Sequence, residues 1–402
     1  MNKIPFSPPL INEDIENQVL DSLRSGWITS GPKVQRLEND IKKYLNVENC
    51  ICVNSWTSGA MVVLKWFGIG PGDEVIIPAY TYAATALAAM NLGATVVMVD
   101  VDDNCLMDVN KLAAAITPKT KAIMPVDIAG LPVNYQKIKA VVDANSQEFT
   151  ASSKAQQLFN RPLIIADAAH SFGAKNNGKL GNHDADITIY SFHAVKNLTT
   201  AEGGAICFNE SLFSEPIDRQ IRLHCLNGQT KDAMSKTNSG NWKYDIVLQG
   251  LKANMPDICA AIGIEQLKIY NKTLERRKEV FQQYFDFFSK CDWATPPASV
   301  VDHLESSYHL YMLRIKNATE EERDAIMTKV IANGVSVNVH FTPLPLLTFF
   351  KESGYSIEHY PNAHANFLNE ISLPIYPQLT DEDVDQVCAT IAAAVKEVLN
   401  LD

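Results

Sequence analysis

The sequence predicts an α/β protein with a mostly parallel central sheet in a large domain and a smaller α+β domain toward the C-terminus. From about residue 50, short apolar segments alternate with helical stretches, which is typical of strand–helix–strand units. The apolar segments are nearly continuous, which indicates strands that are buried on both faces, as in parallel sheets. Beyond residue 271 the alternation gives way to a different mixture of strands and helices.

The chain has 402 residues, which is long for one small core and favours two domains. We predict a large domain over residues 1–270, with the segment 1–49 leading into it, and a small domain over residues 271–402. The strands predicted in the large domain cover residues 50–54, 74–78, 95–99, 122–126, 163–166, 187–190 and 205–208. The helices predicted between them cover residues 57–67, 82–91 and 134–144.

The small domain is predicted to begin with a long charged and aromatic helix from residue 271 to about residue 290. Before it, the polar segment 146–160 predicts a surface excursion or an extension of the preceding helix. The remaining elements are strands over residues 308–315 and 335–340, a helix over 320–333 that ends at Gly334, and an amphipathic helix over 381–399.

Composition narrows the class of protein. The net charge of −11 argues against a broad nucleic-acid surface and against an anionic membrane as partner. The N-terminus lacks an apolar signal core and no apolar run is long enough to span a bilayer, so we expect a cytoplasmic protein. The eight cysteines show no CxxC pair, which favours buried reduced thiols and predicts no metal site.

Two polar residues follow predicted strands and carry the main functional signal. Asp167 ends the apolar segment Ile164-Ile165-Ala166, and Lys196 follows the next strand in a loop closed by a glycine pair. A carboxylate and a lysine at the carboxyl ends of strands can serve pyridoxal phosphate. The carboxylate keeps the pyridine nitrogen protonated, and the lysine amine forms the Schiff base with the aldehyde. Taken alone, Lys196 is best interpreted as a solvated loop lysine and Asp167 as a helix N-cap. Taken together, the two residues predict an enzyme.

Further candidates surround this pair. His170 is either a satisfied polar residue or a contact to Asp167 or to the phenolic oxygen of the cofactor. Trp56 and Thr57 open a helix whose N–H groups could hold the cofactor phosphate, although Ser55 or Thr57 could equally be an ordinary cap. Ser191 could donate its hydroxyl to the same phosphate. In the segment 78–85, an aromatic side chain is either a core residue or a platform that stacks on the pyridine ring.

Almost end to end, the chain resembles the DegT/DnrJ/EryC1/StrS sugar aminotransferases, which are pyridoxal-phosphate enzymes of fold type I. The resemblance rests on Asp167-Ala-Ala-His-Ser171 and Ser191-Phe-His-Ala-Val-Lys-Asn197. Supporting segments are Ser25-Gly-Trp-Ile-Thr-Ser-Gly-Pro32, Gly70-Pro-Gly-Asp-Glu-Val-Ile-Ile-Pro78, Gly250-Leu-Lys-Ala-Asn-Met-Pro-Asp257 and Leu373-Pro-Ile-Tyr-Pro377.

This resemblance implies roles for single residues. Lys196 matches the Schiff-base lysine, Asp167 the pyridinium partner, His170 the residue beside the ring and Tyr82 the stacking aromatic. Trp56, Thr57 and Ser191 match phosphate contacts. Asn254 matches an asparagine that a second subunit lends to the phosphate, which implies a homodimer with shared active sites. Trp27, Thr29 and His340 fall where the family places substrate contacts.

The resemblance also implies the reaction. Glutamate is expected to donate an amino group, through pyridoxal phosphate, to a nucleotide-linked 3- or 4-keto-deoxy sugar for surface polysaccharide or lipopolysaccharide biosynthesis. The sequence departs from the family at Trp56, where a small residue is usual, at Asp127, where many members have histidine, and in the longer segment 146–160. These departures leave cofactor use intact and leave the identity of the sugar open.

Three alternatives stay open at this point. The acceptor could be an oxidised sugar acid. Some relatives are sugar dehydratases, of which the best known replace the lysine by histidine; others retain lysine and use an iron–sulfur cluster, for which this chain has no clustered cysteines. A ligand-sensing regulator would require a DNA-reading module or a basic face, and the sequence shows neither.

Overall fold

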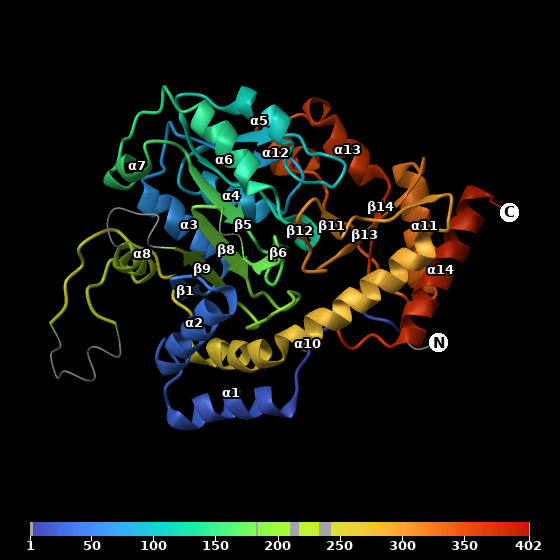
Figure 1. Cartoon of the computed structure of the whole chain (residues 1–402), viewed down its shortest axis with the longest axis horizontal. Helices are drawn as coiled ribbons and strands as arrows, with labels where there is room; N and C mark the ends of the chain where they lie inside the picture. The colour runs from blue at the N-terminus through green and yellow to red at the C-terminus, as the bar shows by residue number, and fades with distance from the viewer. Residues whose placement is uncertain (1–2, 182–183, 210–216, 233–242, 402) are drawn as a thin grey trace.

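The computed structural model describes residues 3–181, 184–209, 217–232 and 243–401, and it is shown in Figure 1. Its central sheet has seven strands in the order β1–β9–β8–β5–β4–β2–β3. Neighbouring strands run parallel except where β9 pairs with β1 and β8, so the predicted mostly parallel sheet is confirmed. The strands are β1 (Asn49–Val53), β2 (Glu74–Pro78), β3 (Thr95–Val99), β4 (Thr120–Ile123), β5 (Leu163–Asp167), β8 (Ile187–Ser191) and β9 (Gly204–Phe208).

Helices cover both faces of this sheet, and together they form what we call the large lobe (Figure 1). Side chains along one strand alternate between two cores: Ile51 and Val53 of β1 pack in one cluster, whereas Cys50 and Cys52 pack in the other. This two-sided burial explains why the strands read as continuous apolar runs. The helices of the large lobe are α1 (Glu13–Ser25), α2 (Pro32–Leu45), α3 (Trp56–Phe67), α4 (Ala83–Met90), α5 (Val109–Ala115), α6 (Tyr135–Ala144), α7 (Lys154–Phe159) and α8 (Asp218–Cys225).

The long helix α10 (Asp257–Phe288) runs from α1 and α2 to a second, smaller lobe (Figure 1). That lobe has a three-stranded sheet of β10 (Ala294–Thr295), β13 (Tyr311–Ile315) and β14 (Glu370–Leu373). Its helices α11 (Glu320–Ala332) and α14 (Asp381–Leu399) both begin with a Thr capping box. Short elements complete the chain: α12 (Thr348–Glu352), α13 (Pro361–Leu368), and the ribbons β6 (Lys175–Asn176), β7 (Lys179–Leu180), β11 (Val300–Val301) and β12 (Leu304–Glu305).

Some predicted boundaries were wrong. The long helix begins at Asp257 rather than at residue 271, so it is continuous across the predicted domain boundary, which itself stays a prediction. The predicted strand 335–340 makes only isolated bridges, because the His340 N–H donates to the Glu370 side chain instead of to a neighbouring backbone carbonyl. The segment 146–160 does not extend α6. It contains α7, where Ser153 and Gln156 donate hydrogen bonds to the carbonyl oxygen of Phe67 at the end of α3.

All eight cysteines are free thiols and six of them are buried, as the sequence predicts. In the described part of the chain, no helix combines the length and the apolar character needed to cross a bilayer.

Candidate active site

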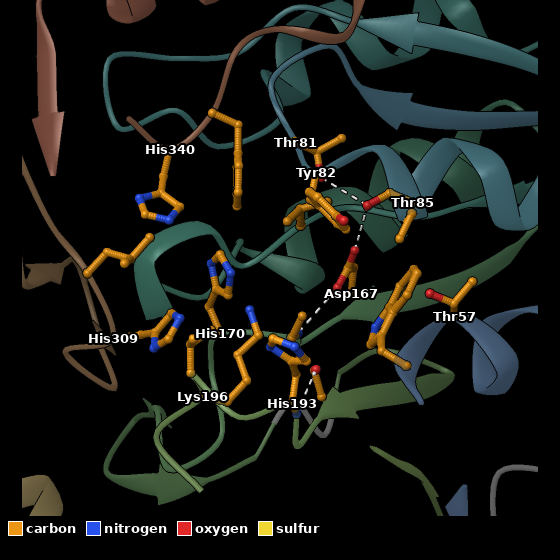
Figure 2. A pocket seen from close by; sticks show the side chains of 18 of the residues that line it. Thr57, Thr81, Tyr82, Thr85, Asp167, His170, His193, Lys196, His309 and His340 are labelled. Carbon is orange, nitrogen blue, oxygen red and sulfur yellow. Dashed lines mark hydrogen bonds between the residues drawn. The ribbon is translucent and has the colours of Figure 1, made fainter. Parts of the chain in front are cut away.

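A cavity of about 480 Å³ lies at the carboxyl edge of the central sheet, where β1, β2, β5 and β8 end. This is the edge at which α/β proteins bind ligands. Segments of the small lobe and the N-terminal Phe6 close its other side. Eight of the predicted site residues line it, and Figure 2 labels most of them: Trp56, Thr57, Tyr82, Asp167, His170, Ser191, Lys196 and His340.

Asp167 is held by a network of hydrogen bonds. It is buried at the end of β5, where its Oδ2 accepts a bond of 2.8 Å from the Thr85 hydroxyl and its Oδ1 accepts the Ala169 N–H. Thr81 in turn contacts Thr85 at 2.9 Å (Figure 2). Burial raises the pKa of Asp167 to about 7, although the Thr85 bond, the Ala169 N–H and the charge of Lys196 oppose this rise. Because no helix follows β5, the N-cap interpretation of Asp167 is wrong.

Thr85 is a site residue that the sequence interpretation missed. The available signal was a pair of threonines four residues apart: Thr81 stands just before the N-cap Tyr82, and Thr85 lies in the first turn of α4.

Lys196 projects into the same cavity from the loop after β8 (Figure 2). The side chain as a whole is half-buried, and it lines the cavity. Burial lowers the pKa of Lys196 to about 8, and the nearby carboxylate of Asp167 acts in the opposite direction. A large fraction of the amine is therefore neutral near pH 8, which is the state that attacks an aldehyde.

His170 lies beside Lys196 with a defined tautomer. Its Nδ1 accepts the Ala129 N–H at 3.2 Å, so its proton is on Nε2. Burial, with the charge of Lys196 adding to it, holds the pKa of His170 well below its usual range, and the ring stays neutral. Its centroid is 4.5 Å from that of the buried His309, whose Nδ1 bonds the Asn197 Oδ1 at 2.9 Å. His309 was not predicted from the sequence, because a lone histidine 139 positions after His170 carries no local signal.

The N-terminus of α3 provides an anion site at one end of the cavity. Ser55 is the N-cap and accepts the Ser58 N–H, which leaves the N–H groups of Trp56 and Thr57 without an acceptor inside the helix. Gly204 of β9 lets the start of α3 lie close to β9, since a Cβ at this position would be 3.0 Å from the Trp56 nitrogen. The hydroxyl-bearing Ser191 also lines the cavity.

The departures at Trp56 and Asp127 have structural explanations. The indole of Trp56 is buried and donates to the Ile189 carbonyl at 3.1 Å, which fixes this large side chain beside the cavity. Asp127 does not line the cavity. Its buried carboxylate accepts hydrogen bonds from the Tyr135 hydroxyl at 2.8 Å and the Ser171 hydroxyl at 2.6 Å, and it fixes the loop after β4.

Aromatic rings form the wall opposite α3. Tyr82 is 64% exposed, and its ring lies 5.8 Å from that of Phe341. His340 stacks on Phe6 at 5.4 Å and contacts Phe341 edge to face at 4.9 Å. The free face of Tyr82 is available to a planar ring.

Trp27, Thr29 and Asn254 do not line the cavity of their own chain. Trp27 and Thr29 therefore cannot make the predicted substrate contacts in the cavity of the same chain. They lie together instead. The Trp27 indole donates to the Ser30 carbonyl, the Thr29 carbonyl accepts the Asp257 N–H, and the Asn254 amide donates to the Ser30 hydroxyl.

Comparisons with known proteins identify the family. The sequence profile of the DegT/DnrJ/EryC1/StrS aminotransferase family matches residues 9–392. The chain belongs to this family. It is 34% identical over 398 residues to the spore coat polysaccharide biosynthesis protein SpsC of Bacillus subtilis, with 98% of this chain and 97% of SpsC covered.

Solved structures agree with this assignment. The sugar aminotransferase Spr1654 of Streptococcus pneumoniae in its pyridoxamine-phosphate form is 42% identical, with a TM-score of 0.93 over 98% of this chain and 100% of that one. Its pyridoxal-phosphate form superimposes with the same TM-score at 41% identity, covering 98% of this chain and 99% of that one. The protein is therefore a pyridoxal-phosphate-dependent sugar aminotransferase of fold type I.

The residues of the cavity fit this cofactor. Lys196 offers a partly neutral amine, Asp167 a carboxylate oriented by Thr85, and the start of α3 an anion site. These three features match the aldehyde, the ring nitrogen and the phosphate of pyridoxal phosphate, respectively.

Proposed function

We propose that this enzyme transfers the amino group of glutamate to a nucleotide-linked 3- or 4-keto-deoxy sugar, for the synthesis of a surface polysaccharide or lipopolysaccharide. The observation that carries the proposal is the pairing of Lys196 and Asp167 across one cavity, each with a pKa shifted toward neutrality. The polysaccharide role of the relative SpsC supports a sugar destined for a polymer.

Bound pyridoxal phosphate supplies an aldehyde that carries the amino group and a ring that accepts electrons. The residues of the chain do the rest. Lys196 Nζ, once free, would remove the proton from the α-carbon of the donor and pass it to C4′, the former aldehyde carbon of the cofactor. Asp167 would accept a charge-assisted bond from the ring nitrogen and would keep that nitrogen protonated. His170 directs its Nε2 proton into the cavity, where it can bond the phenolic oxygen.

The test is a two-part assay with the purified protein. Glutamate alone should yield one equivalent of 2-oxoglutarate per site. The protein, whose cofactor then carries the amino group, should convert a nucleoside-diphosphate keto-deoxy sugar to an amino sugar. Lys196→Ala should lose both steps. Production of 2-oxoglutarate by Lys196→Ala at the wild-type rate would refute the role given to this lysine, and a dehydrated sugar product would favour the dehydratase alternative.

We further propose that the active enzyme is a homodimer in which Asn254 reaches the phosphate of the partner subunit. Two observations support it: Asn254 lies outside the cavity of its own chain, and it groups with Trp27 and Thr29 around Ser30. Exposed apolar side chains, among them Ile28 and Ile246, lie in the same loops.

Complementation tests this arrangement. Lys196→Ala and Asn254→Ala homodimers should each be impaired, and subunit exchange should restore one intact site in each mixed dimer. Since about half of the dimers are mixed, activity should recover to about a quarter of the wild-type value. Exchange without recovery would place Asn254 in the site of its own subunit.

A further inference from the structure

A buried chain of hydrogen bonds leads away from the cavity through His340. The Nδ1 of His340 lies 2.9 Å from the Ser372 hydroxyl, and that hydroxyl lies 2.5 Å from Oε1 of Glu370. The other carboxyl oxygen of Glu370 accepts the backbone N–H of His340 at 2.9 Å. Ser372 and Glu370 are completely buried, so no solvent interrupts this relay.

Strand register explains the arrangement. Glu370 and Ser372 are two residues apart on β14 and face the same side, whereas Ile371 and Leu373 pack in the core of the small lobe. The antiparallel bridge between Asn338 and Ser372 places His340 opposite Glu370. The relay therefore lies on the face of β14 that is turned away from the core of its own lobe.

The ring of His340 is fixed in place. Phe6 stacks on it with an interplanar angle of 21°, Phe341 contacts its edge, and the Tyr80 hydroxyl donates to its carbonyl at 2.9 Å. Because Nδ1 is engaged by Ser372, Nε2 is the ring nitrogen left for the cavity, which His340 lines (Figure 2). Whatever Nε2 contacts there depends on whether it carries a proton.

The proton count along the relay decides that question. Burial and the charge of Lys196 lower the pKa of His340 to about 3, so the ring is neutral and carries one proton. When Glu370 is a carboxylate, Ser372 donates to it, His340 donates from Nδ1, and Nε2 is an acceptor. When Glu370 is protonated, it donates to Ser372, Ser372 donates to Nδ1, and Nε2–H is a donor.

Both states of Glu370 are accessible near neutral pH. Burial raises the pKa of Glu370 to about 8, while the Ser372 hydroxyl, the His340 N–H and the charge of Arg323 oppose the rise. The other titratable groups that interact with Glu370 are Tyr80 and Cys105, and those that interact with His340 are Lys196, His170 and His309.

We propose that Glu370 is a positioning residue that acts through Ser372 and sets whether Nε2 of His340 accepts or donates a hydrogen bond in the cavity. The consequence for the substrate rests on the function proposed above. A keto or ring oxygen of the sugar requires Nε2–H, whereas a hydroxyl or ammonium group can bind the unprotonated Nε2. The relay thus selects which group of the acceptor His340 binds.

Glu370→Gln tests the relay directly. The glutamine amide can donate to Ser372 and its carbonyl can accept the His340 N–H, so the variant keeps both contacts and imitates the protonated acid. We expect ¹⁵N NMR of histidine-labelled protein, assigned with His340→Gln, to show the wild-type proton moving from Nε2 to Nδ1 as the pH rises through about 8. In Glu370→Gln it should stay on Nε2 at every pH. The same tautomer in both proteins from pH 6 to pH 9 would overturn the proposal.

Kinetics provide the second readout. At pH 9, where Glu370 of the wild type is mostly a carboxylate, Glu370→Gln should change the KM for the acceptor by about tenfold, the effect of one hydrogen bond, and should change it more than the rate of the reaction with glutamate alone. At pH 6, where both proteins hold the proton on Nε2, the two KM values should agree. Glu397→Gln, which removes an exposed partner of Lys329, is the matched control and should change neither. Equal effects of Glu370→Gln on both half-reactions would contradict the proposal. Failure of the wild type to react with glutamate would refute the proposed function while the NMR result still decides the relay.

Discussion

The bond from Thr85 to Asp167 provides a quantitative prediction for cofactor affinity. Thr85→Val keeps the shape of the side chain but removes the 2.8 Å donor to a buried carboxylate. A hydrogen bond to a charged group contributes about 1.5–3 kcal/mol, which equals about one to two pKa units. Its loss therefore raises the pKa of Asp167 further and weakens the charged form that pairs with the pyridine nitrogen. At pH 8 the ionised fraction of Asp167 then falls from about nine-tenths to between about a half and a tenth, and we expect the Kd for pyridoxal phosphate to rise by about 2- to 10-fold.

The assay is equilibrium titration of the apoprotein with pyridoxal phosphate, followed by its absorbance at pH 8. Thr85→Ser is the matched control, because it keeps the hydroxyl and should bind the cofactor with the Kd of the wild type. Thermal melting of the apoproteins checks that all variants are folded. An unchanged Kd in Thr85→Val, or an equal loss in Thr85→Ser, would refute the idea that this bond prepares Asp167 for the cofactor.

Three further predictions concern charge and space. The rate at which the apoprotein captures pyridoxal phosphate should rise with pH and level off above about 8, because burial lowers the pKa of Lys196. Asp167→Asn should lower the pH at which this rate is half-maximal. A half-maximal rate near pH 10.5 would contradict the lowered pKa of Lys196. Arg222→Leu should lower the free energy of unfolding in urea by about 1–3 kcal/mol, since it leaves the buried Glu38 unpaired. The expected loss is smaller than for a fully buried pair, because the Arg222 side chain is 43% exposed. An unchanged urea midpoint would refute this prediction. Gly204→Ala should weaken binding of the cofactor phosphate, because its Cβ would lie 2.7 Å from the Tyr190 carbonyl oxygen and 3.0 Å from the Trp56 nitrogen, so that the start of α3 must shift. Unaltered affinity would place the phosphate elsewhere.

The parts of the site that follow strands could be predicted from the sequence. Asp167 and Lys196 stand at the carboxyl ends of apolar strands, and parallel strands end at one edge, so their proximity follows from the topology alone. His309, Phe6 and Glu370 could not be predicted in this way. They reach the site or its surroundings from the small lobe and the N-terminus through tertiary packing, which leaves no periodic signal in the chain.

The same distinction applies to the fold. Buried strands and helices with clear caps were predicted to within a few residues, since local pattern determines them. The predicted strand 335–340 failed because a buried side chain, Glu370, takes the place of a backbone acceptor, and sequence alone does not reveal such a competitor. The long helix α10 was predicted to begin too late, because its first turns are buried against α1 and α2 and lack a charged face there.

Every step proposed for this enzyme requires that Lys196 holds the cofactor and releases it to an amino donor. The most direct test is reduction of the holoprotein with borohydride, followed by peptide mapping by mass spectrometry, before and after addition of glutamate without acceptor. We expect cofactor attached to the Lys196 peptide before glutamate and loss of that label afterwards. A label on another lysine, or none before glutamate, would contradict it.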